Sequence, residues 1–142
     1  MRERSGFEKL DVYRLAEELA DTIWRSVRNW KNFERDTIGK QIVRSADSIG
    51  ANIAEGYGRG SGKDRVRFWE YALGSAREAR GWYFQARHII SGEVALHRMR
   101  LLTQITRLLL SAIPDQRQRR LAEPPKDYQV VPADLLDDAP MP

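Results

Sequence analysis

The sequence predicts an all-α protein, an antiparallel up-down-up-down four-helix bundle. Apolar residues recur every three or four positions over long stretches, the breaks between these stretches are short, and all six prolines lie at or after Pro114. A helical apolar period indicates amphipathic helices, and short connections between long helices favour antiparallel neighbours. Because proline interrupts helix interiors, its absence from residues 1–113 leaves four long helices possible.

The first two helices are expected at about residues 9–30 and 34–57. Each carries one apolar stripe at helical spacing, as a helix that faces a core requires. The stripe of the first helix comprises Val12, Ala16, Leu19, Ile23, Val27 and Trp30. The stripe of the second helix comprises Ile42, Ala46, Ile49 and Ile53.

Alternating glycines follow the second helix, at Gly56, Gly58, Gly60 and Gly62. We expect them to stop the helix, since glycine readily adopts the left-handed backbone that helix ends favour. Ser61 with Asp64 then reads as a capping signal, in which the Ser61 hydroxyl accepts from an orphan amide of the next helix.

The third and fourth helices are expected at about residues 62–91 and 93–113, with a turn at Ser91-Gly92 between them. The seam of the third helix is built largely of small residues, and Gly74 and Ser75 also indicate close approach to a neighbouring helix. This seam comprises Trp69, Ala72, Ala76, Ala79, Tyr83, Ala86 and Ile90. The fourth helix has the stripe Met99, Leu102, Ile105, Leu109 and Ala112.

We therefore expect a bundle domain over residues 1–113 and a proline-containing, acidic C-terminal tail over 114–142. The composition of the tail is that of a flexible linker. Two short apolar runs, at 128–131 and 135–136, are compatible with docking on a neighbour or a partner, but the sequence favours plain disorder.

Three segments carry a resemblance to a known family. They are the run S-I-x-x-N-I-A-E-G-x-G-R-x-S at 48–61, FEKLDVY at 7–13 and ALGSARE at 72–78. The chain resembles the bacterial four helix bundle protein family, also called the ribosomal RNA intervening-sequence protein family, over about residues 7–113. The resemblance implies the bundle fold, a link to insertions in large-subunit ribosomal RNA genes, and similarity in fold to the accessory variability determinant of diversity-generating retroelements. It implies no defined biochemical activity. The segment 82–84 and the arginines of the third helix depart from the family pattern.

The third helix is apolar beyond the face that one bundle would bury. The residues predicted to form an oligomer interface are Phe68, Tyr71, Trp82 and Phe84, and Leu73 also lies off the seam. A helix of this kind needs a second apolar contact surface. Relatives form rings of five, so we expect a homopentamer; the alternative is that these side chains only widen the core.

Charge is unevenly distributed along the chain. Residues 1–55 carry ten basic and ten acidic side chains, residues 56–113 carry ten and four, and residues 114–142 carry four and six. In the third and fourth helices, Arg77, Arg80, Arg87, Arg100 and Arg107 have no acidic residue three or four positions away. They keep helical register, and a ring would repeat them, so we predict that they bind the backbone of RNA or DNA. The alternatives are a solvated charged face and salt bridges to a neighbouring subunit.

Asn52 and Glu55 lie three residues apart in the last turns of the second helix. A carboxylate is disfavoured at the negative end of a helix, so Glu55 needs a partner. The candidates are Arg59, a basic residue of another helix, and the amides near Ser61. We expect Asn52 and Glu55 to share one hydrogen-bonding network that clamps the glycine turn, in preference to a catalytic role.

Several enzymatic chemistries lack their residues. A phosphate-binding loop would need glycine at Tyr57 and Ser or Thr at Asp64. Neither His88 nor His97 has a glutamate three residues before it, as a di-iron bundle would require, and there is no cysteine. We expect no cofactor, no metal and no membrane-spanning segment, and a cytoplasmic location.

The predicted function is that of a non-enzymatic, oligomeric nucleic-acid-binding accessory protein, with a reverse transcriptase as one possible partner. The alternative is a protein-protein interaction scaffold without a nucleic-acid role. Salt-dependent RNA binding separates the two.

Overall fold

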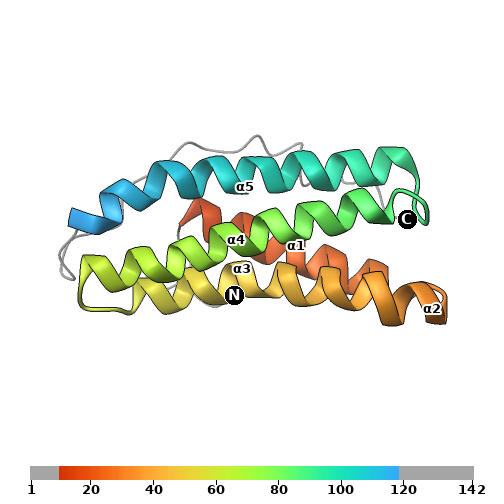
Figure 1. Ribbon diagram of the computed structural model, residues 1–142, viewed down its shortest axis with the longest axis horizontal. Coiled ribbons are helices and arrows are strands. Elements are labelled where there is room, and N and C mark those ends of the chain that lie inside the picture. Colours follow the sequence, from red (N-terminus) through yellow and green to blue (C-terminus); the bar gives the residue numbers. More distant parts are fainter. Residues whose placement is uncertain (1–9, 119–142) are drawn as a thin grey trace, which may run out of the picture.

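The computed structural model describes residues 10–118, with side chains described up to Pro114. Within this range the chain forms α1 (Asp11–Val27), a continuous run of α2 (Asn32–Glu34), the π-helical turn η2 (Arg35–Gly39) and α3 (Lys40–Tyr57), then α4 (Gly62–Ala86) and α5 (Gly92–Gln118). Successive long helices run in opposite directions along the molecule (Figure 1). The described residues are therefore all-helical and form a four-helix bundle, as predicted; the tail from residue 119 onward lies outside them.

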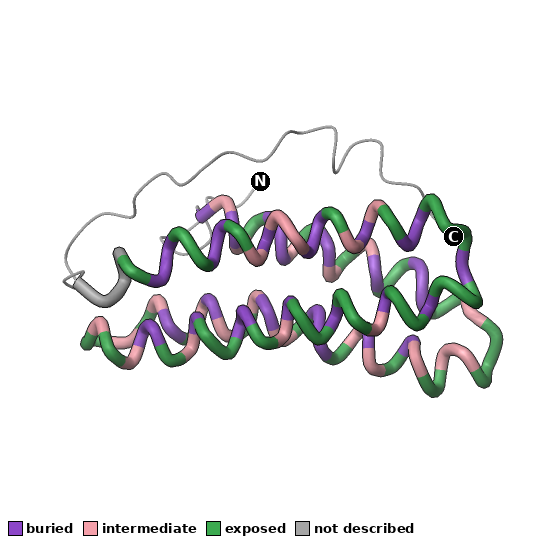
Figure 2. Tube along the Cα trace, turned by 45° about the horizontal axis from the view of Figure 1, so that its top comes forward, coloured by how far each residue is buried: buried purple, intermediate pink, exposed green. Residues whose placement is uncertain are grey.

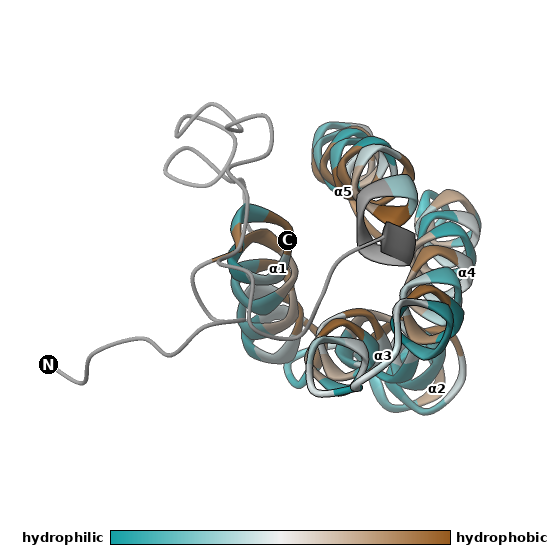
Figure 3. Cartoon of the chain, turned by 90° about the vertical axis from the view of Figure 1, so that its left-hand side faces the viewer, coloured by the Kyte–Doolittle hydropathy of each residue, from teal (hydrophilic) through white to brown (hydrophobic). Residues whose placement is uncertain are grey.

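The predicted apolar stripes form the core. All their members are buried except Trp30 and Met99, which are partly buried and pack against the core. Purple segments recur along the inner side of every long helix (Figure 2), and the hydrophobic sides of the helices face the interior in the view along the bundle (Figure 3). The helix α4 lies between α3 and α5 and packs on both, whereas α1 packs mainly on α3 and only lightly on α5.

Close packing, rather than backbone freedom, explains Gly56. No described glycine has a positive φ, and Gly58, the residue directly after α3, has φ −76° and ψ −7°. The expectation of a left-handed helix end is therefore wrong. A Cβ atom on Gly56 would lie 2.5 Å from Cδ1 of Trp69 and 3.0 Å from the carbonyl oxygen of Arg65. Glycine is required here because the end of α3 presses directly on the first turns of α4.

The approach of α3 to α4 continues through a pair of serines. Ser48 Oγ and Ser75 Oγ lie 2.9 Å apart, which confirms that Ser75 marks a close helix contact. Gly74 does not, since it is exposed and a Cβ atom added to it would meet no atom within 4 Å. The prediction that Gly74 serves close packing within this bundle is wrong.

Helix boundaries differ from the prediction in several places. The helix α1 ends at Val27 rather than near residue 30, and α4 ends at Ala86 rather than near residue 91. The second helix begins at Asn32 and includes the wide turn η2, where a Cβ atom on the buried Gly39 would lie only 2.7 Å from Cγ1 of Val27. The last helix continues past Pro114 to Gln118, across the boundary predicted at residue 113. Pro114 has no N–H to donate to the carbonyl oxygen of Leu110, and only four helical residues follow it.

Candidate nucleic-acid interface

A groove runs along the surface where α4 packs against α5. It has a volume of about 380 Å³ and is lined by Arg80, Leu96, Met99, Arg100, Thr103, Gln104 and Arg107. We call it the α4/α5 groove. Three of the five predicted arginines meet here, although they come from two helices. The side chains that line the groove include no carboxylate in the described part of the chain, so its polar lining is cationic or neutral.

Arg80 is held across the groove by a short chain of hydrogen bonds. Its Nε donates to Oγ1 of Thr103 at 3.1 Å, and the Thr103 hydroxyl donates to the carbonyl oxygen of Met99 at 2.9 Å. These bonds join α4 to α5 and leave the two terminal nitrogens of the Arg80 guanidinium uninvolved. Such a fixed guanidinium presents donors in the fork geometry that phosphate accepts.

The other four arginines divide into two kinds. Arg77, Arg100 and Arg107 are exposed, and none of them makes a hydrogen bond or an ion pair with another residue between 10 and 114. Arg87 instead stacks 3.8 Å from the ring centroid of Phe84 and donates from Nη1 to the Phe84 carbonyl oxygen at 2.6 Å. It caps the end of α4. Neither Arg77 nor Arg87 lines the groove, so the structure brings together only part of the predicted set.

A buried arginine between α4 and α5 was missed by the sequence analysis. Arg98 is 1% exposed and hydrogen-bonds to Tyr83, and its Nη1 lies 2.6 Å from Nδ1 of His97. Burial raises the pKa of Tyr83 far above its ordinary value, while the nearby charge of Arg98 and their hydrogen bond partly oppose this. Burial likewise lowers the pKa of Arg98. The spacing of Ala95, Arg98 and Leu102 places Arg98 on the buried face, and this signal was available in the sequence.

Asn52 and Glu55 do not share a network, so the predicted clamp is wrong. The Asn52 side-chain amide donates to the carbonyl oxygen and to Oγ of Ser48, at 2.9 and 3.0 Å. It therefore extends the serine contact between α3 and α4. Glu55 forms an ion pair with Arg59 on the surface, which was one of the three expected partners. The Ser61 hydroxyl accepts from the Asp64 amide at 3.1 Å, and this confirms the predicted cap.

The aromatic residues predicted as an oligomer interface lie in different surroundings. Phe68 packs edge-on against Tyr71 at 5.7 Å and has the guanidinium of Arg59 over its ring. Trp82 is partly buried against the core and donates to Glu78 at 3.4 Å. Tyr71 and Phe84 remain 52% and 48% exposed, and Leu73 is buried within its own bundle. Of the residues predicted to form the oligomer interface, Tyr71 and Phe84 are thus the two with exposed side chains.

None of the helices between residues 10 and 118 combines the length and hydropathy that crossing a bilayer requires. Within that same range, no three His, Cys, Asp or Glu side chains come together in a way that would hold a metal ion.

Comparison with known proteins gives a consistent result. The family model of the 23S rRNA-intervening sequence protein matches residues 8–111, from just before α1 into the last turns of α5. Among solved structures, the chain is similar to a protein of unknown function from the S23 ribosomal protein family of Bacteroides thetaiotaomicron. The identity is 29% and the TM-score 0.65, over 72% of this chain and 97% of that one. A search of the curated proteins found no match.

Proposed function

We propose that this chain, which belongs to the 23S rRNA-intervening sequence protein family, is a non-enzymatic accessory protein that binds the phosphate backbone of RNA or DNA in the α4/α5 groove. The observation that carries the proposal is the composition of the groove. Three arginines from two helices converge there without a carboxylate in its described lining. We place the protein in the cytoplasm, where ribosomal RNA would be available to it.

The groove suits recognition of a backbone better than recognition of a sequence. Arg100 and Arg107 are seven residues apart, so they lie about 10 Å apart along α5 and on the same side of the helix. Cations spaced along a groove gain affinity from the counterions that they release, and this gain does not depend on base sequence. Thr103 and Gln104 are the uncharged polar side chains of the lining, and Thr103 is already engaged by Arg80.

The proposal includes assembly into a ring, a pentamer by resemblance to the family. Support comes from the outer face of α4, where Tyr71, Gly74, Gly81 and Phe84 recur at helical spacing. Gly74 and Gly81 lie inside a helix with open space around them, at a cost of about 1 kcal/mol each relative to alanine. Glycines between half-exposed aromatic residues would let the backbone of a neighbouring subunit approach closely. A ring would then repeat the α4/α5 groove in every subunit.

The alternative function is a protein-protein interaction scaffold. It is favoured by the apolar part of the groove lining, Leu96 and Met99, and by Leu110 farther along α5. Leu96 and Leu110 are each 49% exposed. In that case the ligand would be a protein with an apolar anchor, and binding would depend little on salt.

Titration of a labelled RNA hairpin and a DNA duplex at several salt concentrations tests the proposal. The variant Arg100→Gln with Arg107→Gln should weaken binding and reduce the log-log salt slope by about 0.9 per lost contact on duplex DNA. The control variant Arg14→Gln with Arg25→Gln removes the same charge from α1 and should change binding little. Equal weakening in both variants would show that the effect depends only on net charge. Unchanged binding in the first variant would exclude the α4/α5 groove as the binding site.

A further inference from the structure

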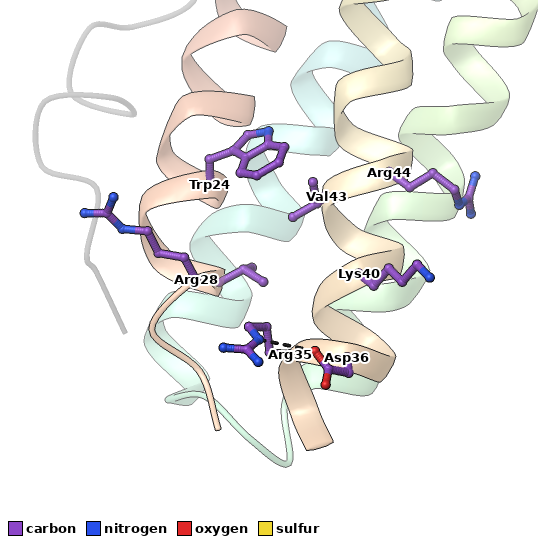
Figure 4. A pocket seen from close by; sticks show the side chains of 8 residues that line it. Trp24, Arg28, Arg35, Asp36, Lys40, Val43 and Arg44 are labelled. Atoms are coloured by element: carbon purple, nitrogen blue, oxygen red, sulfur yellow. Dashed lines mark hydrogen bonds and ion pairs between the residues drawn. The ribbon is translucent and has the colours of Figure 1, made fainter. Parts of the chain in front are cut away.

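A second basic groove lies at the other side of the bundle, between the C-terminal part of α1 and the start of the α2–η2–α3 run. It has a volume of about 510 Å³ and is lined by Trp24, Val27, Arg28, Arg35, Asp36, Lys40, Val43 and Arg44. We call it the α1/α3 groove. In Figure 4, Trp24 extends from α1 toward α3 and Val43 lies across from it; Arg35 and Asp36 lie below this apolar centre, and Arg28, Lys40 and Arg44 extend outward on either side of it.

The floor of this groove is apolar and fixed. Trp24 is 55% exposed, yet its Nε1 donates to both carboxylate oxygens of Asp47 at 3.0 and 3.1 Å. Because Asp47 belongs to α3, these bonds hold the indole across the gap between the two helices. An exposed, immobilised tryptophan loses little conformational freedom on binding, and such side chains dominate the affinity of many interfaces.

The rim is only partly neutralised. Arg35 pairs with Asp36 at 3.2 Å, and Arg44 pairs with Glu78 of α4. Arg28 and Lys40 are exposed and make no side-chain hydrogen bond or ion pair with another residue between 10 and 114. The groove therefore offers an apolar floor with two free positive charges at its edges, which fits a short peptide that combines acidic and apolar side chains.

We propose that residues 134–138 of the C-terminal tail dock in the α1/α3 groove of their own chain. This segment, Asp-Leu-Leu-Asp-Asp, places two adjacent leucines between acidic side chains. Residues 121–142 carry five acidic side chains and one basic one, so the whole end of the chain complements the charge of the rim. The leucines would cover Trp24 and Val43, and the aspartates would face Arg28 and Lys40.

The length of the tail allows this contact. Sixteen residues lead from Arg119, directly after α5, to Asp134, and an extended chain of that length reaches up to about 53 Å. The whole of α5, with 27 residues, is about 40 Å long. The segment 134–138 can therefore reach any position along the length of the bundle. A short linker also holds its segment at a local concentration of about a millimolar, so even a weak contact is occupied for a substantial part of the time.

The experiment uses the full chain with one added cysteine. The sequence contains none, so Ala139→Cys can be labelled uniquely with a bimane fluorophore, which tryptophan quenches on contact. If the segment docks, Trp24→Phe in this background should raise bimane emission about twofold, as expected for a site that is about half occupied. Trp82→Phe on α4, whose side chain does not line the groove, is the matched control and should leave emission unchanged.

Charge exchange tests the complementarity. Arg28→Glu with Lys40→Glu should raise emission in the same way, and adding Asp137→Lys with Asp138→Lys should restore quenching. Reversal of a cation in the other groove, Arg100→Glu, should have no effect. Circular dichroism establishes that each variant remains helical. Emission that does not respond to Trp24→Phe would overturn the proposal, as would equal responses to charge reversal in the two grooves.

Discussion

The two basic grooves carry the same sign of charge but differ in what surrounds it. The polar lining of the α4/α5 groove is cationic or neutral, and two of its arginines have no partner within residues 10–114. In the α1/α3 groove, Arg35 and Arg44 are paired with carboxylates, and the floor is a fixed tryptophan. Unpaired cations in a row favour a polyanion, whereas an apolar floor with a few free cations favours an acidic peptide. The sign of a surface thus does not specify its ligand; the immediate neighbours of each charge do.

Gly56→Ala should have the largest effect on the free energy of unfolding, and it should disturb both grooves together. The added methyl group would overlap Trp69 and the Arg65 carbonyl, forcing α3 away from α4. Overpacking of this kind costs about 1–3 kcal/mol, which urea denaturation measures directly. Gly92→Ala in the first turn of α5 is the control, since it fills open space and should lose no folding stability; a loss equal to that of Gly56→Ala would contradict the packing argument.

Tyr83→Phe should weaken the α4/α5 side alone. It removes a hydrogen bond from the buried guanidinium of Arg98, and a loss of this kind costs about 1–3 kcal/mol of unfolding free energy. Nucleic-acid affinity should fall because the packing of α4 against α5 becomes less ordered. Bimane quenching in the α1/α3 groove should persist. A parallel loss of both signals would show that the two grooves are mechanically coupled.

Tyr83 should also make stability depend on alkaline pH. Its folded pKa is raised above the ordinary value near 10, so its contribution is complete below pH 10 and is lost as pH rises through the folded pKa. Urea midpoints measured between pH 8 and pH 11 should begin to fall near pH 10. The Tyr83→Phe variant should lack this part of the decline, and identical pH profiles would rule out Tyr83 as its source.

Glu78→Gln should have the smallest effect on stability, and it tests the difference between the two grooves most directly. It removes the ion-pair partner of Arg44, an exposed pair worth at most about 1 kcal/mol, while an amide oxygen remains for Trp82. The α1/α3 groove gains a free cation, so docking of the tail segment, measured by bimane quenching, should strengthen. Glu18→Gln on α1 makes the same change in net charge and serves as the control. Equal strengthening in both variants would mean that total charge, not the freed Arg44, is responsible.

Helix positions and core residues were predictable because they depend on local periodicity. The seam from Trp69 to Ile90 is buried, as its three-four spacing predicts. Helix ends were less predictable, because they depend on contacts with other helices. Gly39 packs against α1 and Gly56 packs against α4, and the residues next to each glycine in the sequence do not predict either contact.

The candidate site was predictable only in part for a related reason. Arg80, Arg100 and Arg107 were predicted from their lack of acidic residues one helical turn away, and they do line one groove. The sequence could not show that they meet while Arg77 and Arg87 lie outside, because the register of α4 against α5 is a tertiary property. Nor could it show that Arg44 pairs with Glu78, 34 residues away.

The sequence by itself determined the helices, their buried faces and the basic bias of the second helical pair, since each of these depends on residues a few positions apart. Only the tertiary structure decided which charges are neutralised, which glycines admit a neighbouring helix, and which arginines share a surface. The physical reason is that electrostatic and packing energies depend on distance in space. Folding places residues from different helices within a few ångströms of one another, whatever their separation along the chain.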